Sequence, residues 1–101
     1  MQGLNERTWR IIQKMFPAKQ HEEVGQFLVS ECGTNLPWFD KSDEISLERV
    51  RFAVLKVSKG NLDILLWEIQ GAQKDWRNTL MGAGFAHDVT EHILWADQYL
   101  G

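Results

Sequence analysis

The sequence is poor in residues that cross-link or interrupt a chain, with one cysteine and two prolines among 101 residues. The single Cys32 cannot form a disulfide within the chain, which is typical of a protein from a reducing compartment. No Cys/His pattern predicts a zinc site, and no glycine-rich phosphate loop predicts a nucleotide cofactor, so we expect no cofactor. The first 16 residues interleave charged and hydrophobic residues. We therefore expect no secretion signal and a cytoplasmic protein.

Long hydrophobic runs and basic clusters are also missing. No apolar stretch reaches the ~20 residues that span a bilayer, so we expect no membrane partner. The eleven lysines and arginines are scattered along a chain of net charge −3. Because nucleic-acid binding needs a concentrated basic patch, we expect no nucleic-acid partner either.

What the sequence does contain is typical of one globular domain spanning residues 1–101. Hydrophobic residues make up 44% of the chain and charged residues 25%, which excludes wholesale disorder. No segment alternates apolar and polar residues as a half-buried strand does, whereas apolar residues recur at helical spacing. We therefore predict an all-α fold, a compact bundle of about five helices.

The central prediction is an antiparallel helical hairpin over residues 44–83, with its turn at Lys59-Gly60-Asn61. Gly60 suits the left-handed conformation that ends many helices, and Asn61 can cap the next helix. Each predicted helix carries one apolar stripe with helical spacing. The first stripe comprises Leu47, Val50, Ala53, Val54 and Val57. The second comprises Leu62, Leu65, Ile69, Ala72, Trp76, Leu80 and Ala83.

Three further helices are predicted at residues 4–16, 18–32 and 89–99. Asn5 can cap the first, and Gly25 inside the second indicates a close approach by another helix. Asp88 and Glu91 resemble a capping box at the start of the last helix, and we expect Val89 to face inward. The loop at residues 34–43 is rich in apolar residues, so we expect it to cover the core.

Two motifs in the hairpin resemble those of a family of small, uncharacterised, all-helical bacterial proteins. The first, E-R-V-x-x-A-x-L-K-x-S-x-G-x-L, starts at Glu48, and the second, D-W-R-x-x-L-x-x-A, starts at Asp75. The resemblance covers about half of the chain and implies a bacterial, soluble, helical protein. It carries over no functional residue. The chain departs from the more charged pattern of that family at Asn61, Ile64, Leu66 and Trp67.

The hairpin also carries large apolar residues outside its two stripes. Phe52 and Leu55 stand among charged residues, and Ile64 and Trp67 lie roughly opposite the stripe of the second helix. These four residues predict an interaction face, with a homodimer as the expected assembly. The alternative is that the first two helices of the same chain cover them.

Two polar clusters are weaker candidates for a site. In the segment HDVTEH, the residues His87, Asp88, Glu91 and His92 could bind a divalent metal, although the two Asp/Glu residues could instead cap a helix while both histidines are solvated. Asp75 and Arg77 beside Trp76 could hold a polar ligand, or make ion pairs with neighbouring helices.

Three functions follow as hypotheses. The first is a non-enzymatic helical protein-binding module that forms a dimer through the apolar face. The second is a small metal- or ligand-binding protein that uses HDVTEH. The third is an inhibitor of a protein partner, of the antitoxin or immunity type. Catalysis by Cys32 with His21 or His87 is disfavoured, because a buried free cysteine is usually inert.

Overall fold

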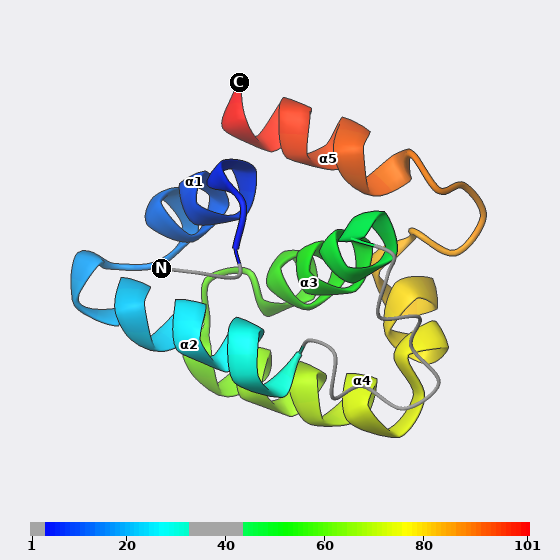
Figure 1. Cartoon of the computed structure of the whole chain (residues 1–101). Helices are drawn as coiled ribbons and strands as arrows, with labels where there is room; N and C mark the ends of the chain where they lie inside the picture. Colours follow the sequence, from blue (N-terminus) through cyan, green and yellow to red (C-terminus); the bar gives the residue numbers. More distant parts are fainter. Residues whose placement is uncertain (1–3, 33–43) are drawn as a thin grey trace.

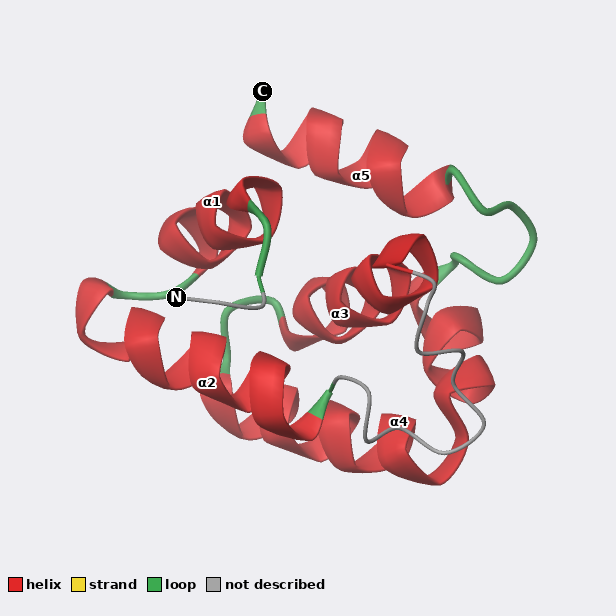
Figure 2. Ribbon diagram, in the orientation of Figure 1, coloured by secondary structure: helices red, strands yellow, loops and turns green. Residues whose placement is uncertain are grey.

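The computed structural model describes residues 4–32 and 44–101, and the side chains of residues 4–32 and 47–101. These residues form five α-helices and one short 3-10 helix, and they contain no strand (Figures 1 and 2). The elements in order are α1 (Glu6–Met15), η1 (Ala18–Gln20), α2 (His21–Glu31), α3 (Glu44–Ser58), α4 (Leu62–Ala83) and α5 (Glu91–Leu100). The predicted all-α architecture is confirmed.

The predicted hairpin is the pairing of α3 with α4. Lys59 and Gly60 both take positive φ angles, of 51° and 81°, which turns the chain at the predicted place. A Cβ atom on Gly60 would lie 2.6 Å from the carbonyl oxygen of Met15, so the turn also needs glycine for space. Asn61 then caps α4, accepting a hydrogen bond from the backbone N–H of Ile64 at 3.1 Å.

Helix α3 is covered on more than the face of its apolar stripe. It lies in the middle of the molecule, with α1 and α5 on one side and α2 and α4 on the other (Figure 1). All six residues from Val50 to Leu55 are buried. Burial of six consecutive residues is expected where neighbours surround a helix on all sides.

Three basic side chains of α3 donate hydrogen bonds to backbone carbonyl groups at or just after the ends of other helices. Arg51 Nε donates to the carbonyl oxygen of Cys32 at 3.0 Å, just after α2. Lys56 Nζ donates to the carbonyl oxygen of Ala83 at 2.8 Å, at the end of α4, and Arg49 Nε donates to that of Phe85 at 3.0 Å. Because the last carbonyls of a helix have no partner within it, these cations satisfy polar groups that packing would otherwise leave buried.

The contact between α1 and α2 confirms the expected close approach at Gly25. A Cβ atom there would lie 2.5 Å from Cη2 of Trp9, so the indole ring occupies the space of the missing side chain. Asn5 caps α1 as predicted, accepting from the N–H of Thr8 at 2.8 Å. The predicted second helix begins later than expected, since η1 takes its first residues.

A kink divides α4 into two arms. Asp75 has φ −157° and ψ 95°, outside helical geometry, so the first arm ends at Lys74. The expectation of one unbroken helix to Ala83 is therefore wrong at this residue. Gly84 ends the second arm in the left-handed conformation, with φ 81°, and Phe85 folds back into the core.

Several sequence-based predictions fall outside the described residues, including the apolar loop at 34–43 and its proposed cover of the core. Within the described part of the chain, no helix combines the length and apolar character that crossing a membrane requires.

Candidate functional site

The predicted four-residue interaction face is not a single surface. Phe52 and Leu55 are fully buried, whereas Ile64 is 42% exposed and Trp67 is 74% exposed. The predicted exposure was therefore wrong for the two residues of α3, which are covered by their own chain. The reason is the central position of α3, which the charged neighbours of Phe52 and Leu55 concealed in the sequence.

Phe52 has two aromatic neighbours on α5. Its ring lies 5.6 Å from the His92 ring and 5.9 Å from the Trp95 ring, centroid to centroid, both in edge-to-face geometry. Phe85 is a second aromatic neighbour of the His92 ring, at 6.3 Å. These contacts make the α3–α5 junction an aromatic core, which is a structural use of the residues that suggested a binding face.

What remains as a candidate interaction site is one side of the first arm of α4. Six residues share this side, and all are exposed: Asp63, Ile64, Trp67, Gln70, Gly71 and Lys74. We call them the Trp67 face. Their spacing of three, four and seven residues places them together on a helix, opposite the buried Leu65, Ile69 and Ala72. Within the described residues, neither Asp63 nor Lys74 has an ion-pair partner.

The Trp67 face is hollowed beside its tryptophan. A depression of about 110 Å³ is lined by Trp67, Gln70, Gly71 and Lys74. Among the described residues, no atom outside the adjoining helix backbone lies within 4 Å of the place where a Cβ of Gly71 would be, so no described neighbour requires a glycine there. Glycine inside a helix costs about 0.5–1 kcal/mol of stability relative to alanine, and no described contact of Gly71 offsets this cost.

A second hollow adjoins the Trp67 face between α2 and α4. It measures about 260 Å³ and shares Gln70 with the depression beside Trp67. Phe27 and Leu66 line it as half-buried apolar side chains, and Gln73 bridges it by donating to Glu31 Oε2 at 3.0 Å. The hollow extends the candidate surface sideways from the helix.

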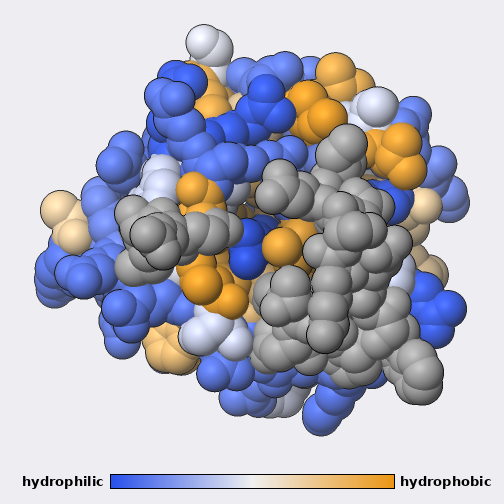
Figure 3. All heavy atoms as spheres, viewed as in Figure 1, coloured by the Kyte–Doolittle hydropathy of each residue, from blue (hydrophilic) through white to orange (hydrophobic). Residues whose placement is uncertain are grey.

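Outside the Trp67 face, the described surface has few large exposed apolar residues. On the side of the molecule drawn in Figure 3, hydrophilic residues cover most of the described surface, and hydrophobic residues appear there in separate groups. The other large apolar residues with substantial exposure are Met81, Val89 and Leu94. Val89 is 62% exposed, so the prediction that it faces the core was wrong. The helix starts after it, at Glu91.

The HDVTEH segment does not gather into a metal site. His87, Asp88 and Glu91 are exposed, while His92 is completely buried. Among the described residues, which include all four, no group of three or more could hold a metal ion. The structural alternative was also wrong in part, because His92 is not solvated and Thr90, rather than Asp88, is the cap residue of α5. Asp88 instead accepts from the N–H of Thr90 at 2.8 Å.

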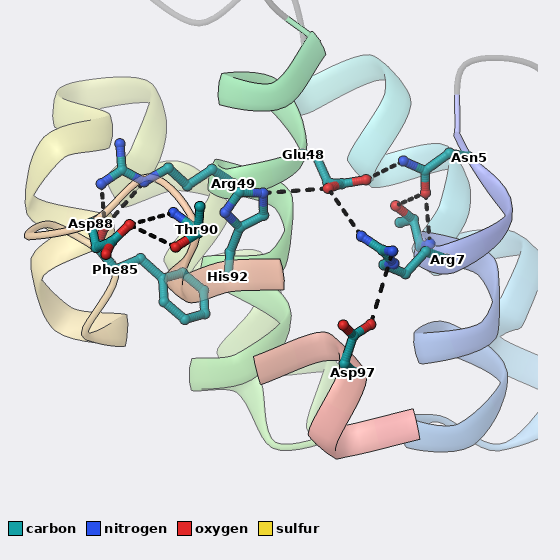
Figure 4. Close-up of polar contacts among 10 residues, drawn as sticks. Asn5, Arg7, Glu48, Arg49, Phe85, Asp88, Thr90, His92 and Asp97 are labelled. Carbon is teal, nitrogen blue, oxygen red and sulfur yellow. Dashed lines mark hydrogen bonds and ion pairs between the residues drawn. The ribbon is translucent and has the colours of Figure 1, made fainter. Parts of the chain in front are cut away.

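His92 belongs to a polar cluster that joins α1, α3 and α5 around Glu48 (Figure 4). Its Nε2 lies 3.3 Å from Glu48 Oε1, and the other carboxylate oxygen of Glu48 accepts a hydrogen bond from Asn5. Arg7 bridges the cluster outward, 3.9 Å from Glu48 and 3.9 Å from Asp97. The sequence motif contained Glu48, but no local pattern linked it to His92, which lies 44 positions later.

The contacts of Glu48 explain its electrostatics. The close contact with His92 is the main cause that holds the pKa of Glu48 below its ordinary value of 4.5, and Asn5 and Arg7 act in the same direction against the effect of burial. Glu48 therefore stays ionised in the folded protein. Through these contacts the cluster connects three helices.

The remaining candidates are engaged in structure. Asp75 Oδ1 accepts from the N–H of Arg77 at 3.1 Å and pairs with its Nε at 3.5 Å, so these charges stabilise the kink rather than reach other helices. Cys32 is buried, and burial raises its thiol pKa to about 12. His21 Nε2 lies 2.8 Å from the carbonyl oxygen of Phe16, and His87 is exposed. The described contacts place neither histidine beside the thiol.

Comparison of the chain with protein-family models, with curated proteins and with solved structures found no match. The resemblance of the hairpin motifs to a family of small bacterial proteins stays a prediction.

Proposed function

We propose that the protein is a non-enzymatic helical interaction module that self-associates through the Trp67 face of α4. The observation that carries this proposal is Trp67 itself. It is 74% exposed in the monomer, more than any other large hydrophobic residue described. Tryptophan supplies more binding free energy at protein interfaces than most other residue types, because it buries a large, rigid apolar surface.

The surroundings of Trp67 support the same role. Ile64, one turn earlier, is also exposed, and the hollow between α2 and α4 adds the half-buried Phe27 and Leu66. Polar and charged residues border this apolar centre, in the arrangement typical of interfaces between soluble proteins. A non-enzymatic role is supported by the engagement of Cys32, His92 and Asp75 in packing, helix joining and the kink.

The test compares two charge introductions on the same helix. Light scattering over a concentration series from the micromolar to the millimolar range should show a dimer for the unchanged chain at the upper end and a monomer for Trp67→Glu throughout. Met81→Glu is the matched control, because Met81 is 65% exposed on the second arm of α4, outside the face. This variant should remain dimeric. A monomeric unchanged chain, or equal loss of the dimer in both variants, would refute the proposal.

A further inference from the structure

The Trp67 face is complementary to itself in one orientation only. Asp63 stands at its start and Lys74 at its end, both exposed and both without an ion-pair partner among the described residues. A two-fold axis that pairs the helices in parallel would bring each residue opposite its own copy, so Asp63 would face Asp63 and Lys74 would face Lys74. An antiparallel pair instead brings opposite charges together at both ends.

We propose that two copies of the protein pair antiparallel through the first arms of α4, with Asp63 of each copy opposite Lys74 of the other. This inference rests on the proposed self-association and specifies its geometry. The first arm spans residues 62–74 and is about 20 Å long at 1.5 Å per residue. Both charge pairs form in the same register, because the symmetry axis that creates one also creates the other.

The register also determines where the tryptophan goes. With Asp63 opposite the partner's Lys74, Trp67 comes opposite the partner's Gln70. Side chains on a helix lean toward its N-terminus, and in an antiparallel pair that direction leads from the partner's Gln70 to the partner's Gly71. The indole ring therefore enters the depression of about 110 Å³ that Gly71 leaves open. The pairing therefore accounts for Gly71, a helical glycine that no described neighbour in the monomer requires.

The size of the face sets the strength of the pair. A standard interface buries about 800 Å² on each partner, which is more than one side of a helix of about 20 Å supplies. The hollow between α2 and α4 adds some area beside Gln70. We therefore expect a dimer with a dissociation constant in the micromolar range.

Charge exchange between the two ends tests the pairing. Asp63→Lys and Lys74→Asp should each weaken the dimer about tenfold, because each replaces two attractions by two repulsions. An equimolar mixture of the two variants should recover the affinity of the unchanged chain as a mixed dimer, since at both ends a lysine of one variant then faces an aspartate of the other. The double variant should recover it as a homodimer. Sedimentation equilibrium measures the dissociation constants, and far-ultraviolet circular dichroism checks that each variant is folded.

The outcomes separate this inference from the proposed function. A dimer whose affinity is unchanged by either single substitution overturns the antiparallel pairing and leaves self-association standing. Weakening in both single variants without recovery in the mixture also overturns the pairing. A chain that stays monomeric at all concentrations overturns both. Binding at physiological salt should be weaker than at low salt, because exposed ion pairs are screened.

Discussion

Replacing Gly25 by alanine should destabilise the protein, although the same change in an open helix stabilises. The new Cβ would lie 2.5 Å from Cη2 of Trp9 and 3.0 Å from Cζ2. The indole ring would have to move back by about 0.9 Å to reach ordinary contact at 3.4 Å. Overpacking of this kind costs about 1–3 kcal/mol, and the better helix propensity of alanine returns about 0.5–1 kcal/mol. We expect a net loss of stability of about 1–2 kcal/mol.

A double-mutant cycle isolates the contact from other effects of the alanine. In a Trp9→Phe background the smaller ring leaves room, so Gly25→Ala should be neutral or slightly stabilising there. Trp9 Nε1 is buried without a hydrogen-bond partner among the described residues, so Trp9→Phe itself sacrifices no hydrogen bond. The coupling free energy from urea unfolding of the four proteins should be about 1–3 kcal/mol.

Gly82→Ala is the control for helix propensity. Gly82 lies inside α4, and no atom comes within 4 Å of its potential Cβ. We expect this variant to be as stable as the unchanged protein or more stable. If Gly25→Ala stabilises as Gly82→Ala does, or costs the same in the Trp9→Phe background as in the unchanged chain, the close packing of α1 on α2 is wrong.

Three further predictions concern the core, the Glu48 cluster and the thiol. Phe52→Ala should lower the free energy of unfolding in urea by about 3–5 kcal/mol, because the Phe52 ring is fully buried. Trp67→Ala should change the stability of the monomer by less than about 0.5 kcal/mol. Comparable losses in the two variants would contradict the burial of Phe52 and the exposure of Trp67. The pKa of Glu48 is lower in the folded than in the unfolded chain, so its contribution to stability is complete above about pH 4.5 and declines as pH falls through the folded pKa. Glu48→Gln should therefore flatten the acid side of a plot of unfolding free energy against pH, and an unchanged slope would count against the cluster. Cys32, with its pKa raised to about 12, should resist a thiol-specific disulfide reagent at about pH 8 until denaturant is added, and immediate reaction in the native state would show that it is accessible.

The hairpin and the caps could be predicted because their signals are local. Asn5 and Asn61 stand where a short polar side chain can reach the free N–H groups of a helix start, and Gly60 stands where the backbone needs a positive φ. Gly25 was informative because glycine is unfavourable in a helix unless something approaches closely. Each of these inferences needs only a few neighbouring residues.

The position of α3 could not be read from its own sequence. Arg49, Arg51 and Lys56 gave the helix a charged appearance that suggests solvent, but all three reach the carbonyl groups at the ends of other helices. How many neighbours surround a helix depends on the whole chain. The burial of His92 against Phe52 likewise joins residues of different helices, and no proline stands in α4 to indicate the kink at Asp75.

Part of the Trp67 face could be predicted from the sequence. Ile64 and Trp67 were identified because they oppose the stripe of buried residues on the same helix. Listing every residue on that side would have added Asp63, Gln70, Gly71 and Lys74, since the spacing is regular. The absence of packing around Gly71 could only come from the structure.

The enclosure of α3 has a consequence for how such a chain can change over generations. In the buried segment 50–55 of this helix, nearly every replacement changes a packed side chain, whichever way that side chain points. Each of the outer helices has a solvent-exposed side, where substitutions have little effect on stability. Substitutions should therefore accumulate on the exposed surface of the outer helices and remain rare in the buried part of α3. Related chains would then keep the fold while their binding surfaces diverge.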